Sequence, residues 1–208
     1  LNAGVKKTGQ LSTSGDLDVF KISVTSSAIL SINFDAPTNS SFNDYFLIGV
    51  FDPDGNILHA QSSGKDLDFQ VTAENEGTFY ALIASSTNYD DGEYGLTINR
   101  SYEDVSDFET ESNDTNSTAD NIAFGKDVKG NLFSQYDQDV FKLQITSAGN
   151  ILVDFNAPTN SSYLHYFTIN LSDSSGTLHS SRSTGKDLSF STKVEETGSY
   201  YLTVKSDT

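Results

Sequence analysis

The chain repeats itself in tandem, and this repeat is the strongest constraint on its fold. DLDVFKISV (16–24) returns as DQDVFKLQI (137–145), an offset of 121 residues (137 minus 16). Because further blocks return at the same offset without insertion, the sequence predicts two copies of one domain of roughly 100–120 residues. These blocks are FDAPTNSS (34–41) with FNAPTNSS (155–162), SSGKDLDF (62–69) with STGKDLSF (183–190), and EGTFYALIA (76–84) with TGSYYLTVK (197–205).

Each copy shows the pattern of half-buried β-strands. Apolar residues alternate with polar ones in short stretches, and turn signals such as DPDG (52–55) and DSSG (173–176) separate the stretches. Alternation places the apolar residues on one face of each strand. The matched apolar sets are Phe20/Ile22/Val24 with Phe141/Leu143/Ile145, Leu30/Ile32/Phe34 with Ile151/Val153/Phe155, Phe46/Ile48/Val50 with Phe167/Ile169/Leu171, and Phe79/Ala81/Ile83 with Tyr200/Leu202/Val204. We predict an all-β protein of two tandem antiparallel β-sandwich domains.

The two copies differ at their ends. We predict a first β-sandwich over 1–100, an acidic linker over 101–120 that belongs to the second copy, and a second β-sandwich over 121–208. The first copy has a last strand in GEYGLTIN (92–99) that the second lacks, and only the second copy has an acidic leader. We therefore expect a piece of a longer array, with an edge on the second copy that is open to strand exchange with another chain.

Composition narrows the class of partner. The formal net charge is −17, so binding to nucleic acid or to an anionic membrane is excluded for lack of a basic surface. The chain has no cysteine, which excludes disulfides and thiol catalysis and is typical of many bacterial secreted proteins. No apolar run is long enough to span a bilayer. We expect a secreted or cell-surface protein.

Two acidic clusters are candidates for a metal site. Glu109, Glu111 and Asn113 share one face of an extended segment because they are two residues apart, and Asp114 follows them. Further along, Asp137 and Asp139 form a second pair just before a predicted strand. Calcium takes about six to eight oxygen ligands, and folding can bring the clusters together. Glu109 to Asn113 spans about 13 Å when extended, so a bent segment or two ions are needed. A solvated acidic linker is the alternative.

The same residues carry a family resemblance. The order E109-T-E111-S-N113-D114-T115, then G130-N-L132 and D137-Q-D139-V-F141, resembles the bacterial pre-peptidase C-terminal domain, to which the collagen-binding domains of clostridial collagenases are similar. The resemblance implies a jelly-roll-like β-sandwich that accompanies a secreted enzyme, and Ca2+ as its ligand. By position it implies a set of metal ligands or their near neighbours: Glu109, Glu111, Asn113, Asp114, Asp137 and Asp139.

The first copy matches this pattern only in part. It keeps Asp16 and Asp18 in D16-L-D18-V-F20 but has no acidic leader, so a full metal site is not expected there. The stretch D52-P-D54-G55 also resembles a calcium loop, but a β-turn explains it better.

Nothing in the sequence indicates an active site. His59, His165 and His179 lie outside any H-E-x-x-H motif, and a G-x-S-x-G elbow is absent. We expect all three histidines on surface loops and predict that the chain is not an enzyme.

Four tyrosines are candidates for binding a ligand. Tyr80 and Tyr201 point away from the predicted core, and Tyr45 and Tyr166 lie beside the repeated PTNSS loops. Exposed tyrosines suit a polysaccharide or a fibrous protein because the ring offers apolar contact and a hydroxyl, and the collagen-binding relatives use surface tyrosines in this way. Strand propensity or packing is the alternative explanation.

Two functions remain open. The first is a non-catalytic calcium-binding accessory module of a secreted bacterial enzyme, which binds substrate or aids export. The second is a calcium-stiffened module of a large surface adhesin. In both, calcium is expected to fold the acidic linker against the second copy and to fix the angle between the domains. Flanking sequence distinguishes them, since the first needs a catalytic domain and the second needs more repeats.

Overall fold

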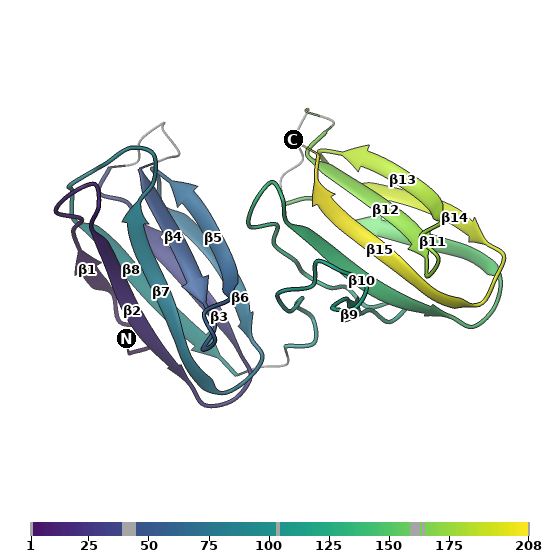
Figure 1. Ribbon diagram of the computed structural model, residues 1–208, viewed down its shortest axis with the longest axis horizontal. Coiled ribbons are helices and arrows are strands. Elements are labelled where there is room, and N and C mark those ends of the chain that lie inside the picture. Colours follow the sequence, from purple (N-terminus) through teal and green to yellow (C-terminus); the bar gives the residue numbers. More distant parts are fainter. Residues whose placement is uncertain (1, 39–44, 103–104, 159–162, 164, 208) are drawn as a thin grey trace. The chain divides into compact units, whose positions relative to one another are not determined.

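The computed structural model describes residues 2–38, 45–102, 105–158, 163 and 165–207. These residues form β-strands and connecting segments, so the predicted all-β class is confirmed (Figure 1). They include no helix that could cross a membrane. The PTNSS loops lie partly outside the described residues. Contacts divide the chain between Ser112 and Asn113. The sandwich before this point is here called unit 1, and the sandwich after it, together with the acidic segment 105–112 that leads into it, is called unit 2.

Unit 1 is a sandwich of two four-stranded sheets. One sheet has the order β1-β8-β3-β6 and the other β2-β7-β4-β5, with antiparallel pairing throughout. The strands are β1 (Lys7–Gly9), β2 (Leu17–Val24), β3 (Ala28–Asp35), β4 (Phe46–Phe51), β5 (Ile57–Ser63), β6 (Leu67–Ala73), β7 (Gly77–Ser85) and β8 (Tyr94–Ser101).

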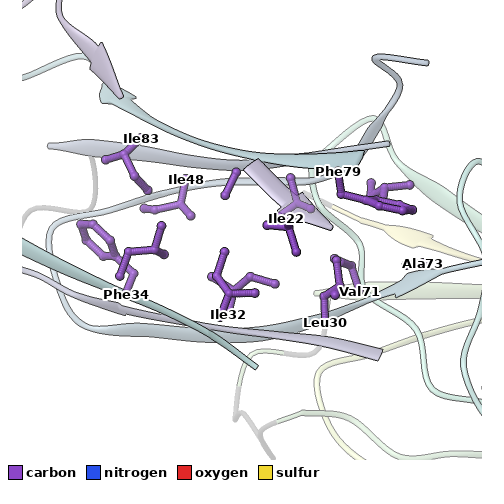
Figure 2. Packing of buried hydrophobic residues seen from close by; sticks show 14 of the residues in the cluster. Ile22, Leu30, Ile32, Phe34, Ile48, Val71, Ala73, Phe79 and Ile83 are labelled. Atoms are coloured by element: carbon purple, nitrogen blue, oxygen red, sulfur yellow. The ribbon is translucent and has the colours of Figure 1, made fainter. Parts of the chain in front are cut away.

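The core of unit 1 lies between these sheets. Ile22, Ile48 and Ile83 on one sheet face Leu30 and Ile32 on the other, and all five are buried (Figure 2). Each comes from a stretch in which apolar and polar residues alternate, so one face of the strand is apolar and the other is not. The predicted sandwich thus follows from the burial of these apolar faces.

Unit 2 repeats this plan with one sheet reduced. Its sheets have the orders β13-β12-β15-β10-β9 and β11-β14, with antiparallel pairs except for β9, which runs parallel to β10. β10 begins 121 residues after β2 (138 minus 17), and the strands up to β15 follow in the same sequence. The strands are β9 (Asp120–Asn121), β10 (Gln138–Ile145), β11 (Gly149–Phe155), β12 (Phe167–Asp173), β13 (Leu178–Thr184), β14 (Leu188–Val194) and β15 (Gly198–Ser206).

The reduced sheet changes the core of unit 2. In unit 1, β8 lies beside β3 and buries Tyr94, Leu96 and Ile98. Within the described part of unit 2, β11 pairs only with β14. Phe155 is accordingly only partly buried, whereas Phe34 at the equivalent place in unit 1 is fully buried. Strand exchange at this edge stays a prediction.

The histidines correct one expectation. His59 was expected on a surface loop, but it lies in β5, is buried, and stacks on Phe69 with ring centroids 3.9 Å apart. Burial lowers the pKa of His59 to about 4. The prediction was wrong because the sequence does not show that Phe69, from a strand of the other sheet, covers the imidazole. His179 lies in β13 rather than in a loop, and His165 is exposed.

The DPDG stretch is a β-turn, as predicted. Gly55 N donates to Asp52 O at 3.2 Å, and Asp52 Oδ1 accepts from Asp54 N and Asn56 N at 2.9 and 2.8 Å. Gly55 has a φ of 89°, a conformation that glycine adopts without cost. The carboxylate of Asp52 therefore closes its own turn.

Candidate metal centre

Three carboxylates lie together at the start of β10. Glu109, Glu111 and Asp139 each place one oxygen within 4.8 Å of the others. Glu109 and Asp139 are buried, and both carboxylate oxygens of the half-buried Glu111 are shielded from solvent. Oxygens that share one calcium ion lie at most about 5 Å apart, because each is about 2.3–2.6 Å from the metal. The three carboxylates can therefore bind a single ion.

The position of Asp139 follows from the strand pattern. Asp139 precedes Phe141 and Leu143 on the inward-facing side of β10, where it pairs with Val204 of β15. A carboxylate there would ordinarily be unfavourable, because a buried charge needs a compensating partner. The acidic segment places two further carboxylates at this position.

Main-chain hydrogen bonds hold the acidic segment along β10. Asn113 O accepts from Val140 N at 3.2 Å, and Ile122 N donates to Lys142 O at 3.0 Å. Between them, Asp120 of β9 pairs with Phe141. The segment thus covers the edge of β10, and Val140 is only 2% exposed.

Asn113 is anchored by a residue that the sequence analysis missed. Asn113 is fully buried, and its Nδ2 donates to Asp120 Oδ2 at 3.1 Å. Asp120 belongs to the same acidic stretch, but it lies seven residues beyond Asn113 (120 minus 113), so the two-residue spacing of the earlier residues does not identify it. The sequence feature that could have identified Asp120 is its place just before Ile122, where apolar residues follow the acidic stretch.

Asp114 and Asp137 lie beside the three-carboxylate group and are not part of it. Asp114 O accepts from Gln138 Nε2 at 2.6 Å, which fixes the acidic segment at the start of β10. Asp137 Oδ2 accepts from Phe133 N at 2.6 Å, and Asp137 N donates to Ser134 O at 3.2 Å. Asp137 therefore closes the loop that leads into β10.

The environment of Asp137 alters its acidity. Burial and, to a smaller extent, the nearby charge of Asp114 raise the pKa of Asp137 to about 6, against the lowering effect of the hydrogen bond from Phe133 N. Asp137 Oδ1 is also buried and accepts no hydrogen bond within the described part of the chain. The folded state therefore disfavours the charged form of the Asp137 carboxyl.

Lowering the pH from about 7 to about 5 is expected to stabilise calcium-free unit 2 through Asp137. The folded protein holds the proton up to a pKa of about 6, while the unfolded chain releases it near the ordinary 3.8. The folded state therefore binds more protons between these values, and the free energy of unfolding rises as the pH falls, by roughly 1 kcal/mol between pH 7 and pH 5. Urea unfolding in EDTA measures this. Asp137→Asn should remove this part of the pH dependence, and an unchanged profile in that variant would contradict the assignment.

Unit 1 uses the equivalent residues differently. Asp16 Oδ2 accepts from Ser12 N at 2.8 Å, so the same loop is closed, but here hydrogen bonds from Ser12 lower the pKa of Asp16. Asp18 Oδ2, at the position of Asp139, accepts from Tyr94 Oη at 2.5 Å. No acidic segment covers β2 among the described residues, and Val19 is 52% exposed.

The predicted ligand-binding tyrosines lie in different environments. Tyr166 is 44% exposed, and Tyr80 is half-buried. Tyr45 packs against the core of unit 1. Tyr201 is only 9% exposed, so the expectation that it is an exposed ring was wrong. It lies on β15 between Lys142 of β10 and Ser172 of β12, in the middle of a sheet where neighbouring side chains shield it.

Comparisons with known proteins do not assign the chain to a family. No family model matches it, and no curated protein matches it. The pre-peptidase C-terminal domain of a collagenase from Bacillus anthracis is 17% identical over 46% of this chain and 89% of that domain, with a TM-score of 0.38.

Two further solved structures cover more of the chain with lower scores. The tandem CBM51 modules of a family 98 glycoside hydrolase from Streptococcus pneumoniae are 10% identical over 91% of this chain and 76% of that one, with a TM-score of 0.29. The CUB1-EGF-CUB2 region of human MASP-1/3 is 11% identical over 98% of this chain and 94% of that one, with a TM-score of 0.29. At these scores the likenesses carry no argument about ligand or activity.

Proposed function

We propose that this chain is a non-catalytic, calcium-binding accessory module of a secreted bacterial enzyme. The observation that carries the proposal is the group of Glu109, Glu111 and Asp139, whose oxygens lie within 4.8 Å of one another in a largely buried position. Buried carboxylates at this distance repel one another strongly unless a cation offsets their charge.

The donor set favours calcium. All three side chains offer hard carboxylate oxygens, which suit Ca2+ and Mg2+ rather than zinc or copper. Glu109 and Glu111 come from a segment without regular secondary structure, and calcium tolerates irregular geometry better than magnesium does. Asn113 and Asp120 orient the segment, while Asp114 and Asp137 hold the loops around it.

Calcium at this site would order the acidic segment. The ion would hold Glu109 and Glu111 beside Asp139 of β10, next to the hydrogen bonds that already hold Asn113 and Ile122. Because the ion binds the folded state, calcium would also stabilise that state by mass action. At the millimolar calcium of extracellular fluids, the segment would remain closed on the edge of β10.

The remaining features support a binding role outside the cell. The chain lacks cysteine and the sequence motifs of common hydrolases, and its order of acidic residues resembles pre-peptidase C-terminal domains. The tandem duplication also favours a second candidate, a repeat module of a surface adhesin. A catalytic domain adjoining the pair in the intact protein supports the first function, and further copies support the second.

Cleavage by a glutamyl endopeptidase tests the calcium-dependent ordering. Cleavage after Glu109 and Glu111 should slow by at least about tenfold when calcium replaces EDTA, because a protease needs the segment to open. The exposed Glu195 provides a control on the same chain, where the rate should not change. Equal cleavage of the acidic segment with and without calcium would count against the proposal.

A further inference from the structure

The outer face of the large sheet in unit 2 is rich in hydroxyl and amide groups. On β12, Phe167, Ile169 and Leu171 point into the core, so Thr168 and Asn170 point outward. Residues of β13 and β15 lie directly beside these two positions, so rows of outward-facing side chains cross the sheet. Thr168 lies between Lys205 and Ser183, and Asn170 lies between Thr203 and Ser181.

Aromatic rings lie at one end of this face. Tyr166 N donates to Thr184 O at 3.3 Å, and Asp207 N donates to Tyr166 O at 3.0 Å, so the sheet continues by one residue beyond β12. Tyr166 therefore shares the outward side with Thr168. Its ring lies 5.1 Å from that of Tyr163, and both tyrosines are exposed.

The polar groups of the face are partly ordered and partly unsatisfied. Thr168 Oγ1 and Ser183 Oγ lie 3.1 Å apart, and hydrogen bonds from both hold the pKa of Asp207 below its ordinary value. In contrast, Asn170 Oδ1 is buried without a hydrogen-bond partner within the described part of the chain. Because Asn170 Oδ1 is shielded from solvent, the accessible hydroxyls of the face are those of the exposed Ser183 and the half-buried Thr203.

Unit 1 shows that the fold itself does not require these groups. At the positions equivalent to Thr168, Asn170 and Thr203, unit 1 carries Leu47, Gly49 and Leu82. The inward positions stay apolar in both copies, so the scaffold is the same while the outer face differs. At these three positions unit 2 is thus polar where unit 1 is not, whereas Ser62 and Tyr45 of unit 1 match Ser183 and Tyr166.

We propose that this face of unit 2 binds a glycan, through Tyr163 and Tyr166 together with Ser183 and Thr203. Hydroxyl and amide side chains match the many hydroxyl groups of a sugar, and exposed tyrosine rings pack against its apolar C–H faces. This inference rests on the proposed role as a binding module and adds the ligand class and its site.

Retention on insoluble polysaccharides tests the inference. The full 208-residue chain is mixed with cellulose, chitin and insoluble xylan, and with type I collagen fibrils as a protein alternative. We expect retention on at least one polysaccharide, weakened by roughly tenfold in Tyr166→Ala and in Thr203→Leu, which introduces the residue of unit 1. Leu152→Ala is the matched control, because Leu152 is 62% exposed on the other sheet of unit 2. Thermal unfolding of each variant verifies that it is folded.

Several outcomes would overturn the inference. These are retention on none of the polysaccharides, retention on collagen alone, or retention that folded Tyr166→Ala and Thr203→Leu leave unchanged. Repeating the assay in EDTA separates this site from the metal centre. Glycan retention without any effect of calcium on the protein would reject the metal proposal alone, and a calcium effect without retention would reject this inference alone.

Discussion

Calcium at millimolar concentration is expected to raise the unfolding midpoint of unit 2 and to leave that of unit 1 unchanged. Among the described residues, the three-carboxylate group lies at Asp139 of β10, and the equivalent Asp18 of β2 has no such group beside it. Calcium at about a hundred times its dissociation constant adds about 2.7 kcal/mol to the free energy of unfolding. For a unit of about 100 residues this corresponds to a shift on the order of 10 °C. Differential scanning calorimetry with calcium and with EDTA measures both transitions in one sample.

Matched substitutions identify the residues responsible. Asp139→Asn should abolish the calcium shift, because it removes one of the three clustered carboxylates. Asp18→Asn at the equivalent position should lower the unit 1 midpoint by weakening the hydrogen bond from Tyr94, without altering the calcium response. A calcium shift that persists in Asp139→Asn, or that appears equally in both transitions, is incompatible with the proposed centre.

Truncation of the equivalent core isoleucines is expected to destabilise one unit at a time. Ile48 and Ile169 are both fully buried on the middle strands β4 and β12. Replacing either with alanine should lower the free energy of unfolding of its own unit by about 2–5 kcal/mol, through lost apolar contact and a residual cavity. Urea unfolding, fitted as two transitions, measures each effect.

The calcium response provides a second reading of the same pair. Calcium should still stabilise unit 2 in Ile48→Ala, where unit 2 is intact. In Ile169→Ala the calcium response should be absent at urea concentrations at which unit 2 is already unfolded. If either substitution shifts both transitions by the same amount, the two units do not unfold separately.

Alternation and duplication predicted most of the fold because both can be recognised from the order of residues alone, without knowing which distant strands pair. Ile22, Ile48 and Ile83 were placed in the core from their spacing alone, and all three are buried. Exposure of single side chains was harder to predict, because it depends on neighbours that come from distant strands. His59 and Tyr201 were misjudged for this reason, since Phe69 covers the first and the middle of a sheet shields the second.

The candidate metal centre shows the same limit. Spacing along an extended segment placed Glu109 and Glu111 on one face, and the structure brings one oxygen from each close to Asp139. Spacing did not separate these residues from Asp137, whose carboxylate accepts a main-chain hydrogen bond that closes a loop. It also missed Asp120, whose link to Asn113 depends on the parallel pairing of β9 with β10.

Isothermal titration of calcium into the EDTA-treated, desalted protein near neutral pH tests the proposed centre most directly. We predict saturable binding to the wild-type chain and to Asp16→Asn/Asp18→Asn, and no saturable binding to Glu109→Gln/Glu111→Gln. Absence of saturable binding to the wild type, or equal binding to both double variants, would show that the acidic segment is a solvated linker rather than part of a calcium site.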